Sequence, residues 1–276
     1  LYVVSGGMEA VSELAWQHRL YLNDGKGNLI RKENAIPGIY LTASGVEPMD
    51  FNGDGYPDLF LGGRAVPWEY GNIPRSYLLQ NDGTGSFKDV TNTLAPELAN
   101  IGLVTDARWV DMNKDKLPDL LISTEWGSLV AFMNEKGKLR KKILSKEQGW
   151  WNFMLPVDID GDGDIDLVAG NFGDNSRVKA SEKYPVRMYM NDFDDNGRVE
   201  QIMTYYVNGT EMPLASKLQL EKSIPMLRKK YLYAADFAQA DLKQLFAPQK
   251  FELKLELINV DKVGEELVEI HYRVKK

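Results

Sequence analysis

A short acidic pattern that recurs along the chain constrains its fold more than any other feature. The pattern has an acid at position 1, an acid or Asn at positions 3 and 5, and an acid at position 9. It occurs four times, as DFNGDGYPD (50–58), DMNKDKLPD (111–119), DIDGDGDID (158–166) and DFDDNGRVE (192–200). Carboxylates this close together repel one another, so a folded chain needs a counter-charge to hold them.

A turn motif alternates with the acidic pattern. YLNDGKGNL (21–29), LLQNDGTGSF (78–87) and AFMNEKGKL (131–139) place Asn, an acid and Gly between apolar residues, which is typical of a β-hairpin. A period of this length, made of short strands and turns, predicts β-propeller blades of about four strands each. The motif recurs at spacings of 58, 53 and 57 residues, at Asn23, Asn81, Asn134 and, in degenerate form, Asn191.

The spacing of the acids predicts a metal. Oxygens at positions 1, 3 and 5 of a tight loop can converge on one point, a carbonyl at position 7 adds another, and the acid at position 9 completes the shell. About six or seven hard oxygen ligands suit Ca²⁺, and the lack of nearby His and Cys disfavours Zn²⁺. The alternative is a set of Asx-rich β-turns that hold no metal. Four copies in a repeating context favour metal, and we predict two to four structural Ca²⁺ ions.

Position 6 of each loop needs a sharp turn, for which glycine is best suited. Gly55, Gly163 and Gly197 meet this need, whereas the second loop has Lys116 there. A side chain and a positive charge at the turn should weaken metal binding. We therefore expect the 111–119 site to be the weakest of the four, or empty.

Together with the Asn-Asp-Gly hairpins, the acidic loops resemble the calcium loops of FG-GAP/VCBS repeats, the blade units of integrin α-chain-like β-propellers. The resemblance covers about residues 1–212. The fourth loop departs from the family pattern, because it ends in Glu and starts only 34 residues after the third. The metal ligands that the resemblance implies are side chains at positions 1, 3, 5 and 9 and a carbonyl at position 7: Asp50, Asn52, Asp54, Tyr56 and Asp58; Asp111, Asn113, Asp115, Leu117 and Asp119; Asp158, Asp160, Asp162, Asp164 and Asp166; and Asp192, Asp194, Asn196, Arg198 and Glu200.

The fold class that these patterns predict is all-β, with the blades of a partial or small propeller over residues 1–212. Family propellers have about seven blades and this chain has material for about four, so we expect it to be part of a larger chain. Helical periodicity and few turn signals predict a helical insertion over 213–248. Strict alternation in FELKLELIN (251–259) and ELVEIHYRV (266–274) predicts a C-terminal β-hairpin over 249–276.

Composition and motifs argue against several functions. The net charge of −7 argues against nucleic acid as a partner. The sequence contains no run of about 18 apolar residues, so no transmembrane span is predicted. Cysteine is absent, the two histidines His18 and His271 are far apart, and no Gly-x-Ser-x-Gly or P-loop motif occurs. The carboxylates of the loops are committed to metal and make poor proton donors. We therefore predict that the chain is not an enzyme.

Exposed aromatic residues with arginines could bind a ligand. The long connection GGRAVPWEYGNIPRS (62–76) carries Arg64, Trp68, Tyr70 and Arg75, which could contact a glycan ring or a peptide. For Trp68 and Tyr70 the alternative is packing in the protein interior.

The leading hypothesis is a non-enzymatic, calcium-stabilised binding module of a secreted or cell-surface adhesion protein, which recognises a protein or a polysaccharide. Extracellular Ca²⁺ is concentrated enough to fill even weak sites, whereas cytosolic Ca²⁺ is not. One alternative is a polysaccharide lyase or hydrolase built on a calcium-loop propeller. Another is a purely structural arc of a larger surface protein.

Overall fold

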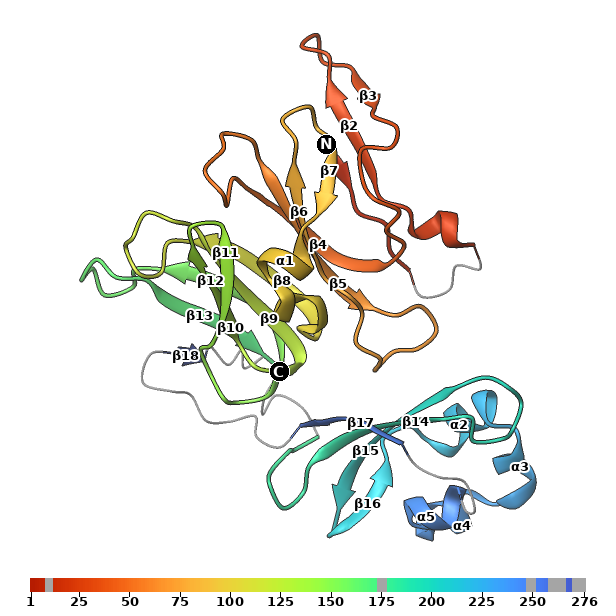
Figure 1. Ribbon diagram of the computed structural model, residues 1–276. Coiled ribbons are helices and arrows are strands. Elements are labelled where there is room, and N and C mark those ends of the chain that lie inside the picture. The colour runs from red at the N-terminus through yellow and green to blue at the C-terminus, as the bar shows by residue number, and fades with distance from the viewer. Residues whose placement is uncertain (8–11, 173–177, 247–251, 258–266, 270–276) are drawn as a thin grey trace. The chain divides into compact units, whose positions relative to one another are not determined.

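Strands dominate the structure, a computed structural model that describes residues 1–7, 12–172, 178–246, 252–257 and 267–269 (Figure 1). They form several antiparallel sheets, which confirms the predicted all-β class with propeller-like blades. By its contacts the chain divides into two compact units. The N-terminal unit comprises residues 1–68, 73–172 and 262–276, and the C-terminal unit comprises residues 69–72 and 173–261. The blades predicted over 1–212 thus contribute strands to both units.

The N-terminal unit contains three sheets. One has the strand order β1-β2-β3, the second is the meander β4-β5-β6-β7, and the third runs β11-β10-β9-β12-β13-β18, with β8 also paired to β9. Two 3-10 helices, Glu13–Trp16 and Pro96–Asn100, and the short helix α1 (Thr91–Leu94) connect strands. The strands are β1 (Tyr2–Val3), β2 (Arg19–Asn23), β3 (Leu29–Arg31), β4 (Thr42–Met49), β5 (Asp58–Ala65), β6 (Tyr77–Asn81), β7 (Phe87–Asp89), β8 (Leu103–Val110), β9 (Asp119–Gly127), β10 (Val130–Glu135), β11 (Lys138–Ile143), β12 (Gly149–Val157), β13 (Asp166–Asn171) and β18 (Leu267–Glu269).

The C-terminal unit contains one sheet with the order β16-β15-β14-β17, and four short helices. Helix α2 begins with a capping box, in which the Ser216 side chain accepts the Gln219 N–H and the Gln219 side chain accepts the Ser216 N–H. The hydrophobic core of the C-terminal unit joins Phe193 and Ile202 of the sheet region to buried helix residues such as Leu227 and Phe246. The elements are β14 (Val186–Asn191), β15 (Glu200–Val207), β16 (Thr210–Pro213), α2 (Lys217–Ser223), α3 (Met226–Lys230), α4 (Ala234–Gln239), α5 (Leu242–Phe246) and β17 (Glu252–Leu257).

All four acidic loops connect two neighbouring antiparallel strands in the same register. We call them loop 1 (50–58, β4 to β5), loop 2 (111–119, β8 to β9), loop 3 (158–166, β12 to β13) and loop 4 (192–200, β14 to β15). In each, the residue before the loop pairs with the acid at position 9: Met49 with Asp58, Val110 with Asp119, Val157 with Asp166 and Asn191 with Glu200. Loop 4 is therefore the structural equivalent of the other three, despite its short distance from loop 3.

The strand before each of loops 1 to 3 contains an irregularity at the same place. The pairing skips Ser44 in β4, Thr105 in β8 and Asn152 in β12, each six residues before the first acid of the following loop. A β-bulge of this kind turns the side chain of the extra residue away from the regular pleat. The repeat thus extends beyond the loop into the strand that leads to it.

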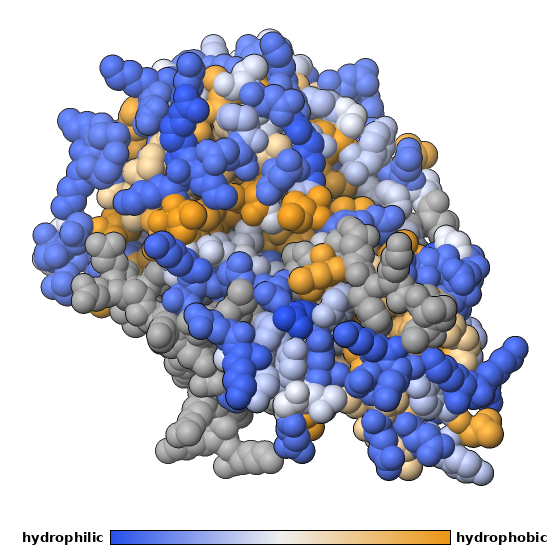
Figure 2. Space-filling model, turned by 60° about the horizontal axis from the view of Figure 1, so that its bottom comes forward, coloured by the Kyte–Doolittle hydropathy of each residue, from blue (hydrophilic) through white to orange (hydrophobic). Residues whose placement is uncertain are grey.

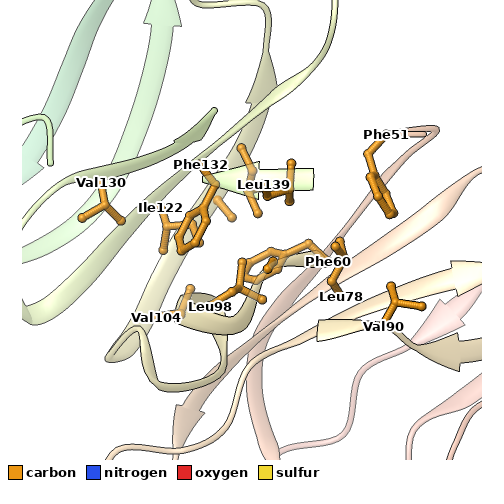
Figure 3. Packing of buried hydrophobic residues seen from close by; sticks show 13 residues of the cluster. Phe51, Phe60, Leu78, Val90, Leu98, Val104, Ile122, Val130, Phe132 and Leu139 are labelled. Carbon is orange, nitrogen blue, oxygen red and sulfur yellow. The ribbon is translucent and has the colours of Figure 1, made fainter. Parts of the chain in front are cut away.

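Buried side chains hold neighbouring sheets of the N-terminal unit face to face. Figure 3 shows one cluster, in which Phe60 and Leu78 of the β4–β7 sheet lie close to Ile122 and Phe132 from β9 and β10. All four side chains are at most 1% exposed, and burial at this level stabilises the fold by about 1.5–3 kcal/mol for each large apolar side chain. A second cluster packs buried side chains of β9 and β10 together with those of β12 and β13, which belong to the same sheet.

The three β-hairpins predicted from the motif of Asn, an acid and Gly are confirmed. β2 pairs with β3, β6 with β7 and β10 with β11, all antiparallel and with the predicted turn between them. The degenerate fourth copy at Asn191 is not such a hairpin. Asn191 ends β14 and leads directly into loop 4, so its likeness to the motif came from a strand end followed by an acid.

The C-terminal hairpin prediction is wrong for the described strands. β17 pairs antiparallel with β14 in the C-terminal unit, whereas β18 pairs parallel with β13 in the N-terminal unit. Alternation identifies a strand but not its partner, and here each strand completes a different sheet. The turn predicted between them, residues 261–265, lies outside the described residues.

Candidate metal centres

The first aspartate of every acidic loop binds the turn of its own loop. One of its oxygens accepts the backbone N–H of position 6 in all four loops, at 2.8 Å for Gly55, 2.8 Å for Lys116, 3.0 Å for Gly163 and 2.7 Å for Gly197. Its other oxygen accepts one or two N–H groups of positions 4 and 5. The carboxylate at position 1 therefore folds the chain around itself and draws positions 1 to 6 into a compact turn.

The turn requires left-handed backbone at positions 4 and 6. Gly53 and Gly55 of loop 1 have φ of 75° and 89°, and loop 3 has glycine at both equivalent positions. In loop 2 the same conformation is adopted by Lys114 and Lys116, with φ of 62° and 71°. A left-handed residue with a Cβ costs about 1–2 kcal/mol. Loop 2 thus has the shape of loop 1 and carries the strain that glycine avoids.

The acid at position 9 is buried in three loops. Asp58 and Asp119 are 0% exposed and Glu200 is 7% exposed, and burial raises the pKa of all three, that of Asp58 to about 6. Oδ1 of Asp58 accepts the Asn81 N–H at 2.8 Å, and Oδ1 of Asp119 accepts the Asn134 N–H at 2.7 Å. Asp58 and Asp119 therefore each tie an acidic loop to the hairpin of their own sheet.

The second oxygen of the position 9 acid distinguishes loop 1 from the others. In loops 2, 3 and 4 it accepts the N–H of position 2, at 3.0, 2.9 and 2.9 Å. In loop 1 burial raises the pKa of Asp58, and the nearby Phe51 N–H offsets only part of this rise. The Oδ2 atom of Asp58 is buried and has no hydrogen bond of normal geometry. A buried carboxylate oxygen without a full partner is costly unless a cation completes it.

The acids of loops 3 and 4 converge most closely. Oxygens of Asp158, Asp160 and Asp162 lie within 4.8 Å of one another, and so do oxygens of Asp192, Asp194 and Glu200. The loop 3 group is exposed, whereas in loop 4 the Oδ1 atom of Asp194 is buried without a hydrogen bond. Loop 4 ends in the longer Glu, and the structure still brings this carboxylate to the position that Asp takes in the other loops.

These donor sets fit a hard divalent cation. Each loop offers side-chain oxygens at positions 1, 3, 5 and 9, and the carbonyls predicted as further ligands are those of Tyr56, Leu117, Asp164 and Arg198. In loop 1 the amide of Asn52 bonds Asp54, and in loop 2 Asn113 bonds Asp115 in the same way at 2.9 Å, which holds positions 3 and 5 together. Oxygen donors without nitrogen or sulfur suit Ca²⁺ or Mg²⁺ better than Zn²⁺.

Two positioning residues escaped the sequence reasoning. Asn81 and Asn134 were assigned only to hairpin turns, where their side-chain oxygens do accept N–H groups of Gly83 and Gly137. Their backbones also bind the position 9 acids, and the Asn134 amide donates to the Phe51 carbonyl of loop 1 at 2.8 Å. The signal was present in the sequence as motif order, because each Asn lies in the hairpin motif that follows its acidic loop, 23 residues after Asp58 and 15 residues after Asp119.

The predicted ligand residues Arg64, Trp68, Tyr70 and Arg75 are divided between the two units. Arg64 pairs with Glu125 at 2.6 Å, and Arg75 pairs with Asp89 at 3.2 Å and lies over the Tyr77 ring. Trp68 is 55% exposed and has a left-handed backbone with φ of 65°. Tyr70 belongs to the C-terminal unit, whereas the other three belong to the N-terminal unit. Their role in ligand binding stays a prediction.

A polar network crosses the sheet of the C-terminal unit. The guanidinium of Arg187 contacts Glu256 at 2.5 Å and Glu211 at 3.3 Å, and Glu211 also accepts hydrogen bonds from Tyr189 and Thr204. The network joins β17, β14, β15 and β16. Both carboxylates are held by the same arginine, so the arrangement ties the strands together.

Comparison with known proteins agrees with these repeats. A family model described as an FG-GAP-like repeat matches residues 4–61 and 111–169, and these segments contain loops 1, 2 and 3. No curated protein matches the chain. The matched segments and the repeated loop-and-strand register together show that the chain contains FG-GAP-like repeats.

Proposed function

We propose that the chain is a non-enzymatic binding module whose β-blades are stabilised by Ca²⁺. The observation that carries this proposal is the common geometry of the four loops, in which acids at matched positions meet between paired strands. The buried, unpartnered oxygens of Asp58 and Asp194 support it further, because a cation is the partner that such atoms lack.

A bound ion would link the two antiparallel strands that each acidic loop connects. A bound Ca²⁺ supplies positive charge at the point where the acids meet. The position 1 carboxylate already shapes the turn through the position 6 N–H, and the position 9 acid is anchored in the following strand. The ion would therefore reduce the repulsion between the carboxylates of the loop, at the point where the two strands are connected. The existing hydrogen bonds would stay in place.

We further propose that the module acts outside the cell or at its surface and binds a protein or a polysaccharide. Millimolar Ca²⁺ outside cells would keep weak sites filled. Among the described residues, no helix is long and apolar enough to cross a membrane. Figure 2 shows apolar residues exposed among largely hydrophilic ones on the face that it draws.

The decisive experiment measures thermal unfolding in Ca²⁺, in Mg²⁺ and with a chelator, and counts bound ions by calorimetry. One site at a Ca²⁺ concentration of 100 times its Kd adds about 2.7 kcal/mol to the free energy of unfolding. At about 2–4 °C per kcal/mol, two to four sites should raise Tm by more than about 10 °C. An unchanged Tm and no bound ion would reduce the loops to acidic turns and remove the support for an extracellular role.

The enzyme alternative is tested with the same sample. Incubation with a panel of polysaccharides, followed by an assay for reducing ends and for the unsaturated product of a lyase, would reveal lyase or hydrolase activity. We expect no turnover, because Glu211 and Glu256 are both paired with Arg187 and the loop acids are metal ligands. Turnover that is lost in Glu211→Gln would overturn the non-enzymatic proposal.

A further inference from the structure

A cavity of about 210 Å³ lies between β4 and β8, lined by residues 44–47, residues 105–108 and Phe60. We propose that this cavity binds one neutral sugar ring of a polysaccharide. The inference rests on the binding role proposed above and assigns that role a ligand class and a site. None of its residues belongs to a metal loop.

The repeat itself builds the polar wall of the cavity. Ser44 and Thr105, the bulged residues of β4 and β8, both line it. The Ser44 hydroxyl contacts the Gly62 carbonyl at 3.2 Å, and the Thr105 hydroxyl contacts that of Ser123 at 2.8 Å. The Ser44 hydroxyl donates to that carbonyl and keeps its lone pairs for a ligand, and the Thr105 hydroxyl keeps at least one lone pair.

A charged cluster spans the cavity between the two strands. Nη1 of Arg108 lies 3.0 Å from Oε1 of Glu47 and 3.0 Å from Oδ1 of Asp106. It also donates to the Ala107 carbonyl at 2.9 Å. Among the described residues all of these contacts run through Nη1, so the donors on Nε and Nη2 stay available, as does Oε2 of Glu47. The Arg108 side chain is 42% exposed and the Glu47 side chain 31% exposed, so a ligand can reach both.

The balance of charge favours a neutral ligand. Two carboxylates and one guanidinium leave the cluster at −1, so an anion meets two acids and a cation meets the arginine. A hydroxyl group satisfies both, because it accepts from Arg108 and donates to Glu47. A sugar ring presents several such groups side by side, which matches a donor and an acceptor held next to each other.

Size and shape limit the ligand to a single ring. Pockets for drug-sized ligands measure about 300–1,000 Å³, and this cavity is smaller. Val46, Ala107 and Phe60 add apolar surface to its lining, against which the C–H groups of a sugar can pack. Gly45 also lines the cavity, and a Cβ built there meets no atom within 4 Å, so a larger side chain has open space at this position.

The test titrates the full chain with neutral methyl glycosides of glucose, galactose, mannose, fucose and N-acetylglucosamine, followed by saturation-transfer NMR and by the amide shifts of Gly45 and Ala107. At least one glycoside should bind and shift these amides. Methyl glucuronide and glucosamine, which carry opposite charges, should bind at least tenfold more weakly. Gly45→Val should fill the cavity, and Arg108→Lys, which loses the planar fork, should weaken binding at least tenfold.

Gly38→Val is the matched control, since a Cβ there makes only an ordinary 3.6 Å contact with Tyr40 and lies outside this cavity. Binding that survives Gly45→Val, or that is equally strong for the charged probes, would overturn the proposal. So would the failure of every glycoside to bind, which would leave the cavity as a water-filled gap. Each titration is run with Ca²⁺ and with a chelator. Failure of the calcium proposal would appear as an unchanged Tm, and failure of the sugar proposal as unchanged NMR signals.

Discussion

Loops 1 and 2 have almost the same ligands and the same strand register, and they differ where the chain turns. Loop 1 uses Gly53 and Gly55, and loop 2 uses Lys114 and Lys116 with φ in the same left-handed region. In both, the first aspartate accepts the position 6 N–H at 2.8 Å. The turn is therefore shaped by the hydrogen bonds of the carboxylate, and glycine lowers its cost without being required for it.

The two loops differ again at the buried acid. Asp119 accepts two backbone N–H groups, from Met112 and Asn134, whereas Asp58 has one hydrogen bond of normal geometry and one unpartnered oxygen. Loop 1 is thus the less strained turn with the less satisfied acid, and loop 2 the more strained turn with the fully bonded acid. We expect loop 1 to gain more from a cation.

The largest expected effect comes from removing the buried acids in metal-free protein. Asp119→Ala leaves two buried N–H groups without an acceptor and should lower the free energy of unfolding by about 2–4 kcal/mol. Asp58→Ala leaves one and should cost about 1–2 kcal/mol. Urea unfolding in chelator measures both. Equal losses would show that the unpartnered oxygen of Asp58 does not set the two loops apart.

The hairpin asparagines should differ in the same direction. Within the described residues each Asn side chain makes three hydrogen bonds: Asn134 with Phe51, Pro118 and Gly137, and Asn81 with Pro57, Gly83 and Gly85. At about 1 kcal/mol for each hydrogen bond, Asn134→Ala should cost about 3 kcal/mol, and Asn81→Ala should cost less because its bonds are less buried. The measurement is again urea unfolding with chelator. A larger loss for Asn81→Ala would contradict the bridging role of Asn134.

Exchanging the turn residues tests the strain directly. Lys116→Gly should raise the free energy of unfolding by about 0.5–1 kcal/mol, since the relief of left-handed strain exceeds the entropy that glycine adds to the unfolded chain. Gly55→Lys should lower it by a similar amount. Calorimetry should also show tighter Ca²⁺ binding in Lys116→Gly. Changes of the same sign in both variants would sink the explanation by backbone strain.

The buried acid of loop 1 should also affect the pH dependence of stability. The pKa of Asp58 is raised to about 6 by burial, so between about pH 4 and pH 6 the folded chain binds more protons at this residue than the unfolded chain. Without metal, this residue makes the free energy of unfolding fall as pH rises through that window. Asp58→Asn should flatten the slope, measured by thermal unfolding at a series of pH values. Stabilisation by Ca²⁺ should grow over the same window, because the ion needs the ionised carboxylate.

Much of the candidate site was predictable because its parts are local. The four loops, the three Asn-Gly hairpins and the strands after the loops all follow from patterns of about ten residues or fewer. The same reasoning gave too little weight to loop 4. Distance along the chain made Asp192 and Glu200 appear out of place, yet β14 and β15 hold them in the common register. It also read Asn191 as a hairpin residue, because a strand end followed by an acid occurs in both motifs.

The sequence by itself determined the acidic turns, since a carboxylate at position 1 reaches the N–H of position 6 without help from the rest of the chain. The sequence also determined the strands and their inward faces, because apolar and polar residues alternate along each strand. Only the tertiary structure decided which strand lies beside which. It placed β17 and β18 in different sheets, carried the Asn134 amide to Phe51 across 83 residues, and brought Glu47 to Arg108 across 61. Such contacts depend on the packing of whole sheets, and no short stretch of sequence encodes them.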